Sequence, residues 1–309
     1  MKQFQFVLFI VILTGFKWRD NPLSLDATQR SKGYALLIGL KDIDYDAYRN
    51  KYKIEFSPEA TAGVPKDLKN MRQILSSQSY EITELRDKDA TSKGMLDAIA
   101  RIGSKIAPND HFVFYYSGHG NQVEDKNCDE KSGFDQAYVT YDDYTIDDSI
   151  QVKLIKHFAK TKNVMVIDAC HSSSLHKLFI DFPVVINKIK GRNTFVYSAE
   201  EVLEKEVNTK SDCEYDQTID IEEPYRLIYF GAASDNATAV GTSLGGELTR
   251  TMKKIYDEAT QINENWSFYD YPKYACEISQ RILASQRLQY HEIGAIDKQF
   301  RNSQPFKIY

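Results

Sequence analysis

Three short, predominantly apolar runs constrain the fold of this chain more than any other feature. They are Tyr34–Gly39, His111–Tyr116 and Val164–Ile167, each of strand length and without regular alternation of apolar and polar residues. A strand that is buried on both faces has this pattern, and such strands belong to parallel sheets covered by helices. Segments with helical spacing separate the runs, which is typical of βαβ units. We therefore predict an α/β protein with a mainly parallel sheet.

The stretches between and after these runs predict the remaining elements. Thr91 or Ser92 could cap a helix that stops before Pro108. Glu200–Glu223 is charged and poor in apolar residues, which predicts an exposed loop. The other expected helices cover Val64–Ser77, Val152–Lys160, a segment after Gly245-Gly246 and Ala275–Leu288, and the other expected strands cover Tyr80–Leu85, Asn193–Ser198 and Arg226–Ala232.

Length and composition exclude several classes of protein. The chain has 309 residues, of which 42% are hydrophobic, enough for one large domain or two ordinary ones. Its formal net charge is −5 with both signs mixed throughout, which argues against a nucleic-acid partner. The cysteines are Cys128, Cys170, Cys213 and Cys276. Their wide, unpaired spacing excludes a zinc ribbon and makes a disulfide scaffold a poor interpretation.

The amino-terminal run Phe6–Leu13 leaves two interpretations open. It is too short to span a bilayer comfortably and has the length of a signal-peptide core, although no clean cleavage site follows. One interpretation makes 1–32 a signal-like segment and polar linker, with export or envelope association and membrane attachment through residues 4–16. The other is a buried strand or helix of a cytoplasmic protein.

Two of the predicted strands run directly into reactive side chains. His111–Tyr116 is followed by Ser117, Gly118 and His119, and the strand ending at Ile167 is followed by Asp168, Ala169 and Cys170. Ligands bind at the carboxyl ends of parallel strands, so neighbouring strands would bring His119 and Cys170 together. An imidazole raises the thiolate fraction of a nearby thiol and then protonates the leaving amine. The pattern predicts a dyad in which Cys170 is the nucleophile and His119 the base.

The residues around this dyad suggest further roles and weaker alternatives. The backbone amides at Gly118, Gly120 and Cys170 could polarise a scissile carbonyl as an oxyanion hole. A cysteine after an apolar strand can also be an inert core residue. A metal module built from Cys170, His171 and His176 lacks a fourth ligand.

The two motifs together resemble the catalytic pair of caspase-like cysteine peptidases, and most of all the metacaspase branch. His119 and Cys170 are 51 positions apart, and Cys170 is followed by His171 and Ser172 as in metacaspases. Ser173 departs from the resemblance, because metacaspases usually have Gly there. The family implies a cysteine-type endopeptidase.

The resemblance also implies an architecture. It covers Tyr34–Leu178 and resumes at Tyr229–Thr249 in a part similar to the small-subunit region. The implied fold is a mainly parallel six-stranded sheet sandwiched by helices. We expect one peptidase domain over 33–309, composed of a large-subunit-like part (33–180), a connecting segment (181–225) and a small-subunit-like part (226–309).

Two aspartates suggest the substrate. Asp168 lies two residues before Cys170, so both side chains of an extended strand share a face, and Asp67 falls in the first turn of a predicted helix. Carboxylates beside a nucleophile would bind Arg or Lys. The resemblance implies the same preference, with Asp67, Ser117 and Asp168 on the family's substrate-pocket positions. The alternative for Asp67 is that the helix dipole simply favours an acidic residue in the first turn. The alternative for Asp168 is that its carboxylate accepts bonds from loop amides.

An acidic cluster between the motifs raises the question of Ca²⁺. Its members are Asp125, Asp129, Glu130, Asp135, Asp142, Asp143, Asp147 and Asp148. Many oxygen donors could hold this ion, but a solvated acidic loop has the same composition. Asp135, Asp147 and Asp148 resemble calcium ligands of some metacaspases, whereas Leu175–Lys177 replaces an expected aspartate. The thiol chemistry itself needs no cofactor.

These observations combine into one principal prediction. The chain is expected to be a cysteine endopeptidase that cleaves after Arg or Lys, could be stimulated by Ca²⁺ and could mature from a zymogen by cutting itself. Candidate cut sites in the connecting segment are Lys188, Lys190, Arg192, Lys205 and Lys210. The resemblance favours a monomer. The alternative is a catalytically silent caspase-like scaffold that binds basic peptides or a protein partner.

Overall fold

The computed structural model describes most of the chain between residues 30 and 309. The described ranges are 30–124, 134–169, 225–233, 239, 241–262, 270–282 and 288–309. Met1–Arg30 separates from Ser31–Tyr309, which forms one compact unit. The fold below is that of the second unit.

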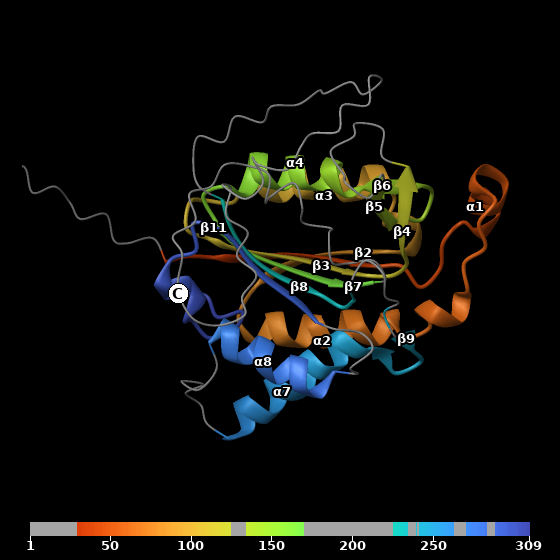
Figure 1. The fold of residues 1–309 in the computed structure, drawn as a ribbon. Helices are drawn as coiled ribbons and strands as arrows, with labels where there is room; N and C mark the ends of the chain where they lie inside the picture. Colours follow the sequence, from red (N-terminus) through yellow and green to blue (C-terminus); the bar gives the residue numbers. More distant parts are fainter. Residues whose placement is uncertain are drawn as a thin grey trace, which may run out of the picture. The chain divides into compact units, whose positions relative to one another are not determined.

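A six-stranded sheet forms the centre of this unit (Figure 1). Its strands, in spatial order, are β11 (Gln289–Gly294), β8 (Arg226–Gly231), β7 (Lys162–Asp168), β3 (His111–Ser117), β1 (Gly33–Gly39) and β2 (Glu81–Arg86). All neighbouring pairs are parallel except β11 and β8. Every residue of β1, β3 and β7 is buried, as the unbroken apolar runs predict. The prediction of a mainly parallel α/β fold is therefore confirmed.

Helices cover both faces of the sheet, with α3 and α4 on one side and α2, α7 and α8 on the other (Figure 1). The α-helices of the described residues are α1 (Tyr45–Tyr52), α2 (Val64–Ser77), α3 (Ser92–Gly103), α4 (Asp147–Phe158), α7 (Glu247–Ile262), α8 (Tyr271–Arg281) and α9 (Lys298–Arg301). Strand side chains point alternately into the two cores. Leu36 and Phe114 lie in the first core, and Leu37 and Tyr115 lie in the second.

Local side-chain bonds set several helix starts. Thr91 caps α3, as predicted, because its Oγ1 accepts the amide of Gly94 at 2.9 Å. Asp270 caps α8 in the same way, and Pro272 follows in its first turn. The expected start of this helix at Ala275 and its extension to Leu288 are therefore wrong, since α8 runs from Tyr271 to Arg281.

Several small elements lie outside the sequence prediction. A second sheet has the order β4 (Gly120–Glu124), β5 (Phe134–Val139) and β6 (Tyr144–Ile146), and a hairpin joins β9 (Gly241–Thr242) to β10 (Gly245–Gly246). Two 3₁₀ turns, η1 (Pro58–Thr61) and η2 (Asp87–Asp89), follow α1 and β2. Helix α4 begins at Asp147 and not at Val152. Strands of two or three residues, such as β6, β9 and β10, are too short to give a clear periodic pattern.

Some predictions fall on residues outside the described ranges. They include the amino-terminal run, the strand at Asn193–Ser198, the loop at Glu200–Glu223 and the candidate cut sites. The boundaries of the large-subunit-like part, the connecting segment and the small-subunit-like part stay predictions for the same reason. Among the described residues, no helix has the length and apolar character needed to cross a bilayer.

Candidate active site

The carboxyl ends of three neighbouring strands lie in register. Gly39 of β1 pairs with Ser117 of β3, and Ser117 pairs with Asp168 of β7. His119 follows Ser117 by two residues, and Cys170 follows Asp168 by two. The parallel register thus brings the starts of both motifs side by side, although Cys170 itself lies outside the described residues. The distance between its thiol and the imidazole stays a prediction.

A cavity opens at this edge of the sheet. The residues that line it come from the ends of β3 and β7, from the stretch between η1 and α2, and from the β9–β10 hairpin. Asp67, Ser117, His119 and Asp168 all line it. Gly118 lines it too, so five of the predicted site residues share one cavity.

Asp67 lies on the cavity wall, at 2% exposure, in the first turn of α2. Its two carboxylate oxygens accept the amide of Gly246 at 2.9 and 3.0 Å, and Oδ2 also accepts the hydroxyl of Ser117 at 3.0 Å. Burial raises the pKa of Asp67, and the negative charge of Asp168 adds a smaller increase, to about 8 in total. The side chain thus holds the hairpin to the strand ends, and its charge is costly when the cavity is empty.

Asp168 is the second buried carboxylate. Its Oδ2 accepts both the amide of Thr249, at 2.9 Å, and the hydroxyl of the same residue, at 2.7 Å. Burial raises the pKa of Asp168 and the charge of Glu247 adds to the effect, while the bonds from Thr249 oppose it. Both bonds use Oδ2, and no described residue donates to Oδ1.

Two glycines of β10 allow this close approach. A Cβ atom at Gly245 would lie 2.4 Å from Oδ1 of Asp67, and one at Gly246 would lie 2.3 Å from Oδ2 of Asp168. Gly245 also has a φ of +115°, which residues with a side chain rarely adopt. The Gly-Gly pair is therefore required where the backbone contacts both carboxylates.

The cavity has a negative wall without a matching positive one. Among the described residues that line it, none is Lys or Arg. Neither Asp67 nor Asp168 forms an ion pair with any other described residue. Burial raises the pKa of both acids, and the charge of Asp168 raises that of Asp67 further, so the pair favours a shared proton or a bound cation.

His119 lies at the cavity edge with its ring against Phe56, at 4.8 Å between ring centroids. Burial lowers the pKa of His119 to about 4, and a hydrogen bond with the backbone of Ser57 opposes this. Nε2 is buried and has no partner among the described residues. The bond to Ser57 therefore belongs to Nδ1, which leaves a neutral ring with the lone pair of Nε2 available as a base.

The backbone at His119 is also fixed. Its carbonyl accepts the hydroxyl of Tyr116 at 2.6 Å and the amide of Val139 at 3.2 Å. Gly118 lines the cavity, while Gly120 begins β4 and faces Tyr138 across that ladder. The predicted oxyanion role of both glycines and of the Cys170 amide stays a prediction.

The predicted calcium residues are only partly described. Asp135 in β5 and Asp147 at the start of α4 are both buried, and Gln151 donates to Oδ2 of Asp147 at 3.0 Å. Within the described ranges, no group of three or more His, Cys, Asp or Glu residues is placed to hold a metal ion. The side chain of Asp148 and residues 125–133 lie outside those ranges. Calcium binding stays a prediction.

Three residues contribute to the site without having been predicted from the sequence. Phe56 and Ser57 contact His119 from a stretch that shows no periodic pattern, and Thr249 holds Asp168 from the start of α7. The Gly245-Gly246 pair before a helix was a visible signal for Thr249. For Phe56 and Ser57 the sequence offers none.

A family model for the caspase domain matches residues 32–270. The chain belongs to the caspase-domain family. Among curated relatives, metacaspase-1 of Candida albicans is 29% identical over 197 residues, which are 58% of this chain and 38% of the relative. Metacaspase-1 of Plasmodium falciparum is 32% identical over 188 residues, which are 57% of this chain and 29% of the relative. The resemblance to metacaspases is therefore confirmed.

A solved structure has a similar fold. A protein from Geobacter sulfurreducens superposes with a TM-score of 0.63 at 21% identity, over 90% of this chain and 99% of that one. This likeness concerns the fold alone. The chain spans about two fifths of the length of the Candida albicans relative. Membership places the chain among caspase-like cysteine peptidases, whereas its own activity and substrates are matters for proposal.

Proposed function

We propose that this caspase-domain protein is a cysteine endopeptidase that hydrolyses peptide bonds after Arg or Lys. The observation that carries the preference is the buried pair Asp67 and Asp168, which line one cavity without a described cation beside them. A guanidinium or ammonium group in that cavity would lie beside both carboxyl groups and favour their ionised forms. An aspartyl side chain would bring another acid beside the two buried carboxyl groups and no cation, so cleavage after Asp is disfavoured.

The chemistry proposed for the dyad uses Cys170 and His119 alone. Nε2 of His119 accepts the thiol proton, and the thiolate attacks the scissile carbonyl carbon. The imidazolium then donates that proton to the leaving amine, which leaves a thioester on Cys170. Water, deprotonated by the same imidazole, hydrolyses the thioester and restores the thiol. Burial keeps the ring of His119 neutral near pH 7, so the lone pair of Nε2 is available to accept a proton.

The deciding experiment compares peptide reporters that differ only at the residue before the cut bond. We expect arginyl and lysyl reporters to be hydrolysed and an aspartyl reporter to stay intact. Cys170→Ala should abolish turnover while the protein still binds the arginyl peptide. Faster cleavage of the aspartyl reporter would overturn the proposed preference. Binding by the wild type without turnover would favour the silent scaffold instead.

Calcium stimulation is proposed on the family resemblance of Asp135, Asp147 and Asp148. Two of these are buried carboxylates, which suits a hard cation, but the described donors are too few to form a site by themselves. No catalytic step is assigned to the ion. Unchanged arginyl hydrolysis in excess EGTA would contradict this proposal.

Maturation and location complete the proposal. A peptidase with this preference could cut its own connecting segment after Lys188, Lys190, Arg192, Lys205 or Lys210. Mass spectrometry of wild type and Cys170→Ala would distinguish self-cleavage from an outside protease. Export or membrane attachment through residues 4–16 can be tested by amino-terminal sequencing of the native protein. Sedimentation would test the monomeric state.

A further inference from the structure

The imidazole of His119 depends on a segment that is not part of the central sheet. Phe56, which lies between α1 and η1, packs against the ring at a tilt of 33°, and the backbone of the next residue, Ser57, bonds to it. The strand end fixes only the backbone of His119. The orientation and cover of its ring therefore depend on what holds the stretch after α1 in place.

Tyr48 connects that stretch to a turn in the second sheet. It is 1% exposed, and its ring packs edge-on against Phe56 at 5.3 Å and against Tyr144 at 5.2 Å. Its hydroxyl contacts two backbone carbonyls of the β5–β6 turn, those of Thr140, at 2.7 Å, and Asp143. Tyr48 is thus packed on Phe56 at one end and bonded to the turn at the other.

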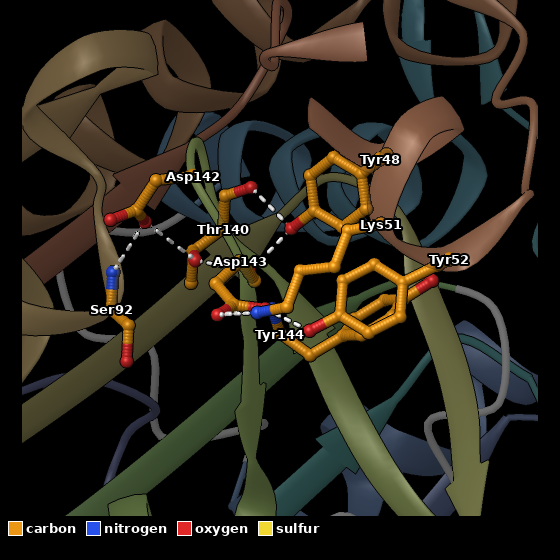
Figure 2. Close-up of polar contacts among 8 residues, drawn as sticks. All are labelled: Tyr48, Lys51, Tyr52, Ser92, Thr140, Asp142, Asp143 and Tyr144. Atoms are coloured by element: carbon orange, nitrogen blue, oxygen red, sulfur yellow. Dashed lines mark hydrogen bonds and ion pairs between the residues drawn. The ribbon is translucent and has the colours of Figure 1, made fainter. Parts of the chain in front are cut away.

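The side chain of Asp143 bonds to two residues of α1 and so holds this helix against the same turn (Figure 2). Its Oδ2 accepts from Nζ of Lys51 at 2.6 Å, and its Oδ1 accepts the hydroxyl of Tyr52. Tyr52 also packs on Tyr144, at 4.5 Å between ring centroids. We call Tyr48, Lys51, Tyr52 and Asp143 the Asp143 clasp.

The turn that carries Asp143 is itself anchored. The amide of Tyr141 donates to the carbonyl of Ala90 at 2.9 Å, and Asp142 accepts the amide of Ser92 at 3.1 Å. One residue before the turn, Val139 donates its amide to the carbonyl of His119. The strand that leads into the turn therefore contacts the backbone of His119, and the turn is connected to its ring through α1 and Phe56.

We propose that Asp143 is a positioning residue for His119, which acts by holding α1 so that Phe56 covers the imidazole and directs it into the cavity. This inference rests on the proposed function of His119 as the base. Burial is the main cause of the low pKa of His119. Asp67 and Asp168 are the carboxylates that line the same cavity, and the other groups packed on the ring, Phe56 and Ser57, carry no charge.

Loss of the clasp should expose the ring to water. The pKa of His119 would then rise from about 4 toward the ordinary imidazole value of about 6.5. More of the base would be protonated at slightly acidic pH, and the neutral ring would be less well aimed. A small misplacement of a reacting group can cost about 100-fold in rate.

The test measures the titration of His119 directly, without relying on turnover. In full-length Cys170→Ala protein, the His119 imidazole is followed by NMR from pH 3 to 8, with and without Asp143→Ala. The matched control is Asp46→Asn, which breaks an exposed ion pair with Arg49 on the same helix. We expect an upward shift of the midpoint with Asp143→Ala and none with Asp46→Asn. Equal midpoints in folded Asp143→Ala and its parent would overturn the proposal.

Two further variants keep the test decisive if Asp143→Ala does not fold. Asp143→Asn keeps an oxygen acceptor but loses the charge that pairs with Lys51, so its shift should be smaller. Tyr48→Phe removes both bonds to the turn while keeping the ring on Phe56, and it should also shift the midpoint upward. If both folded variants titrate like the parent, the proposal fails.

Kinetics then separate this inference from the proposed function. In the otherwise wild-type enzyme, Asp143→Ala should lower kcat about 10-fold to 100-fold on an arginyl reporter with KM little changed. The acid limb of kcat/KM should move to higher pH. If the wild type shows no turnover, the proposed function fails, while the NMR titration still decides the role of the clasp. A lower kcat with an unmoved acid limb would reduce Asp143 to a structural residue.

Discussion

Asp143 and the cavity pair Asp67 and Asp168 are the same chemical group in opposite surroundings. Burial alone would raise the pKa of Asp143, but bonds from Lys51, from Tyr52 and from the amide of Tyr144 hold it below its usual range. Asp67 and Asp168 receive only neutral donors, and burial raises the pKa of both. A carboxylate with its own cation stabilises local structure, whereas one without a cation favours a ligand that brings one.

The largest expected effect would come from neutralising one acid of the cavity. Asp168→Asn keeps an oxygen that can accept both bonds from Thr249, so the fold should survive while the charge is lost. Removing one partner of a buried charge pair costs about 2–5 kcal/mol, or roughly 30-fold to several thousand-fold in kcat/KM for an arginyl reporter. Steady-state kinetics would measure this fall.

The matched control for this prediction is another buried aspartate of the same sheet. Asp110 accepts the amides of Lys32 and Ala107, just before the first residue of β3. Asp110→Asn should leave kcat/KM of the folded protein unchanged. Equal losses in the two variants would break the comparison, because burial in general, and not the cavity, would then matter.

A smaller loss is expected when the hairpin is pushed away from the acids. Gly246→Ala would place a methyl group 2.3 Å from the carboxylate of Asp168, so β10 or Asp168 must shift. Such overpacking typically costs about 1–3 kcal/mol of unfolding free energy. The arginyl preference should weaken together with the stability.

The control for that glycine is an equally crowded one away from the cavity. At Gly103, the last residue of α3, a methyl group would lie 2.5 Å from the Cβ atom of His157. Chemical denaturation and reporter kinetics of Gly103→Ala should show a loss of stability but no change in preference. If Gly246→Ala keeps full selectivity, the hairpin does not shape the cavity.

Features that depend on neighbouring residues in the sequence could be predicted, whereas contacts between distant residues could not. The strands β1, β3 and β7 are buried on both faces, so unbroken apolar runs identify them, and α/β topology then places Asp168 near His119. The Asp143 clasp gives no such pattern. Its members are tyrosines and charged residues about 90 positions apart in sequence, brought together by a turn between two short strands.

The raised pKa of Asp67 predicts a pH dependence of stability. A carboxyl group whose pKa is raised on folding, from 3.8 to about 8 for Asp67, contributes fully to stability below the unfolded value. That contribution is lost as the pH rises toward 8. His119 and His111, whose pKa values burial lowers, act in the opposite direction below pH about 6.5.

Comparison with Asp67→Asn removes the histidine contributions. The free energy of unfolding of the wild type minus that of Asp67→Asn should fall between pH 4 and pH 8, by at most on the order of 1 kcal/mol per pH unit. Urea denaturation at a series of pH values measures it. A difference that stays constant over this range would mean that Asp67 ionises as an ordinary carboxyl group.

The smallest effect is expected at the partner that distinguishes Asp143 from the cavity pair. Lys51 is exposed, so Lys51→Met should change overall stability little. It removes the built-in cation, however, and the pKa of Asp143 should rise because burial is no longer opposed by that charge. NMR titration of the Asp143 carboxyl group would measure this rise. In the wild type, addition of methylguanidine should lower the pKa values of Asp67 and Asp168 and leave that of Asp143 unchanged. If Asp143 titrates as before in Lys51→Met, the hydrogen bonds from Tyr52 and Tyr144 are enough to hold its charge. The contrast between the two groups of acids would then depend on the number of donors and not on a cation.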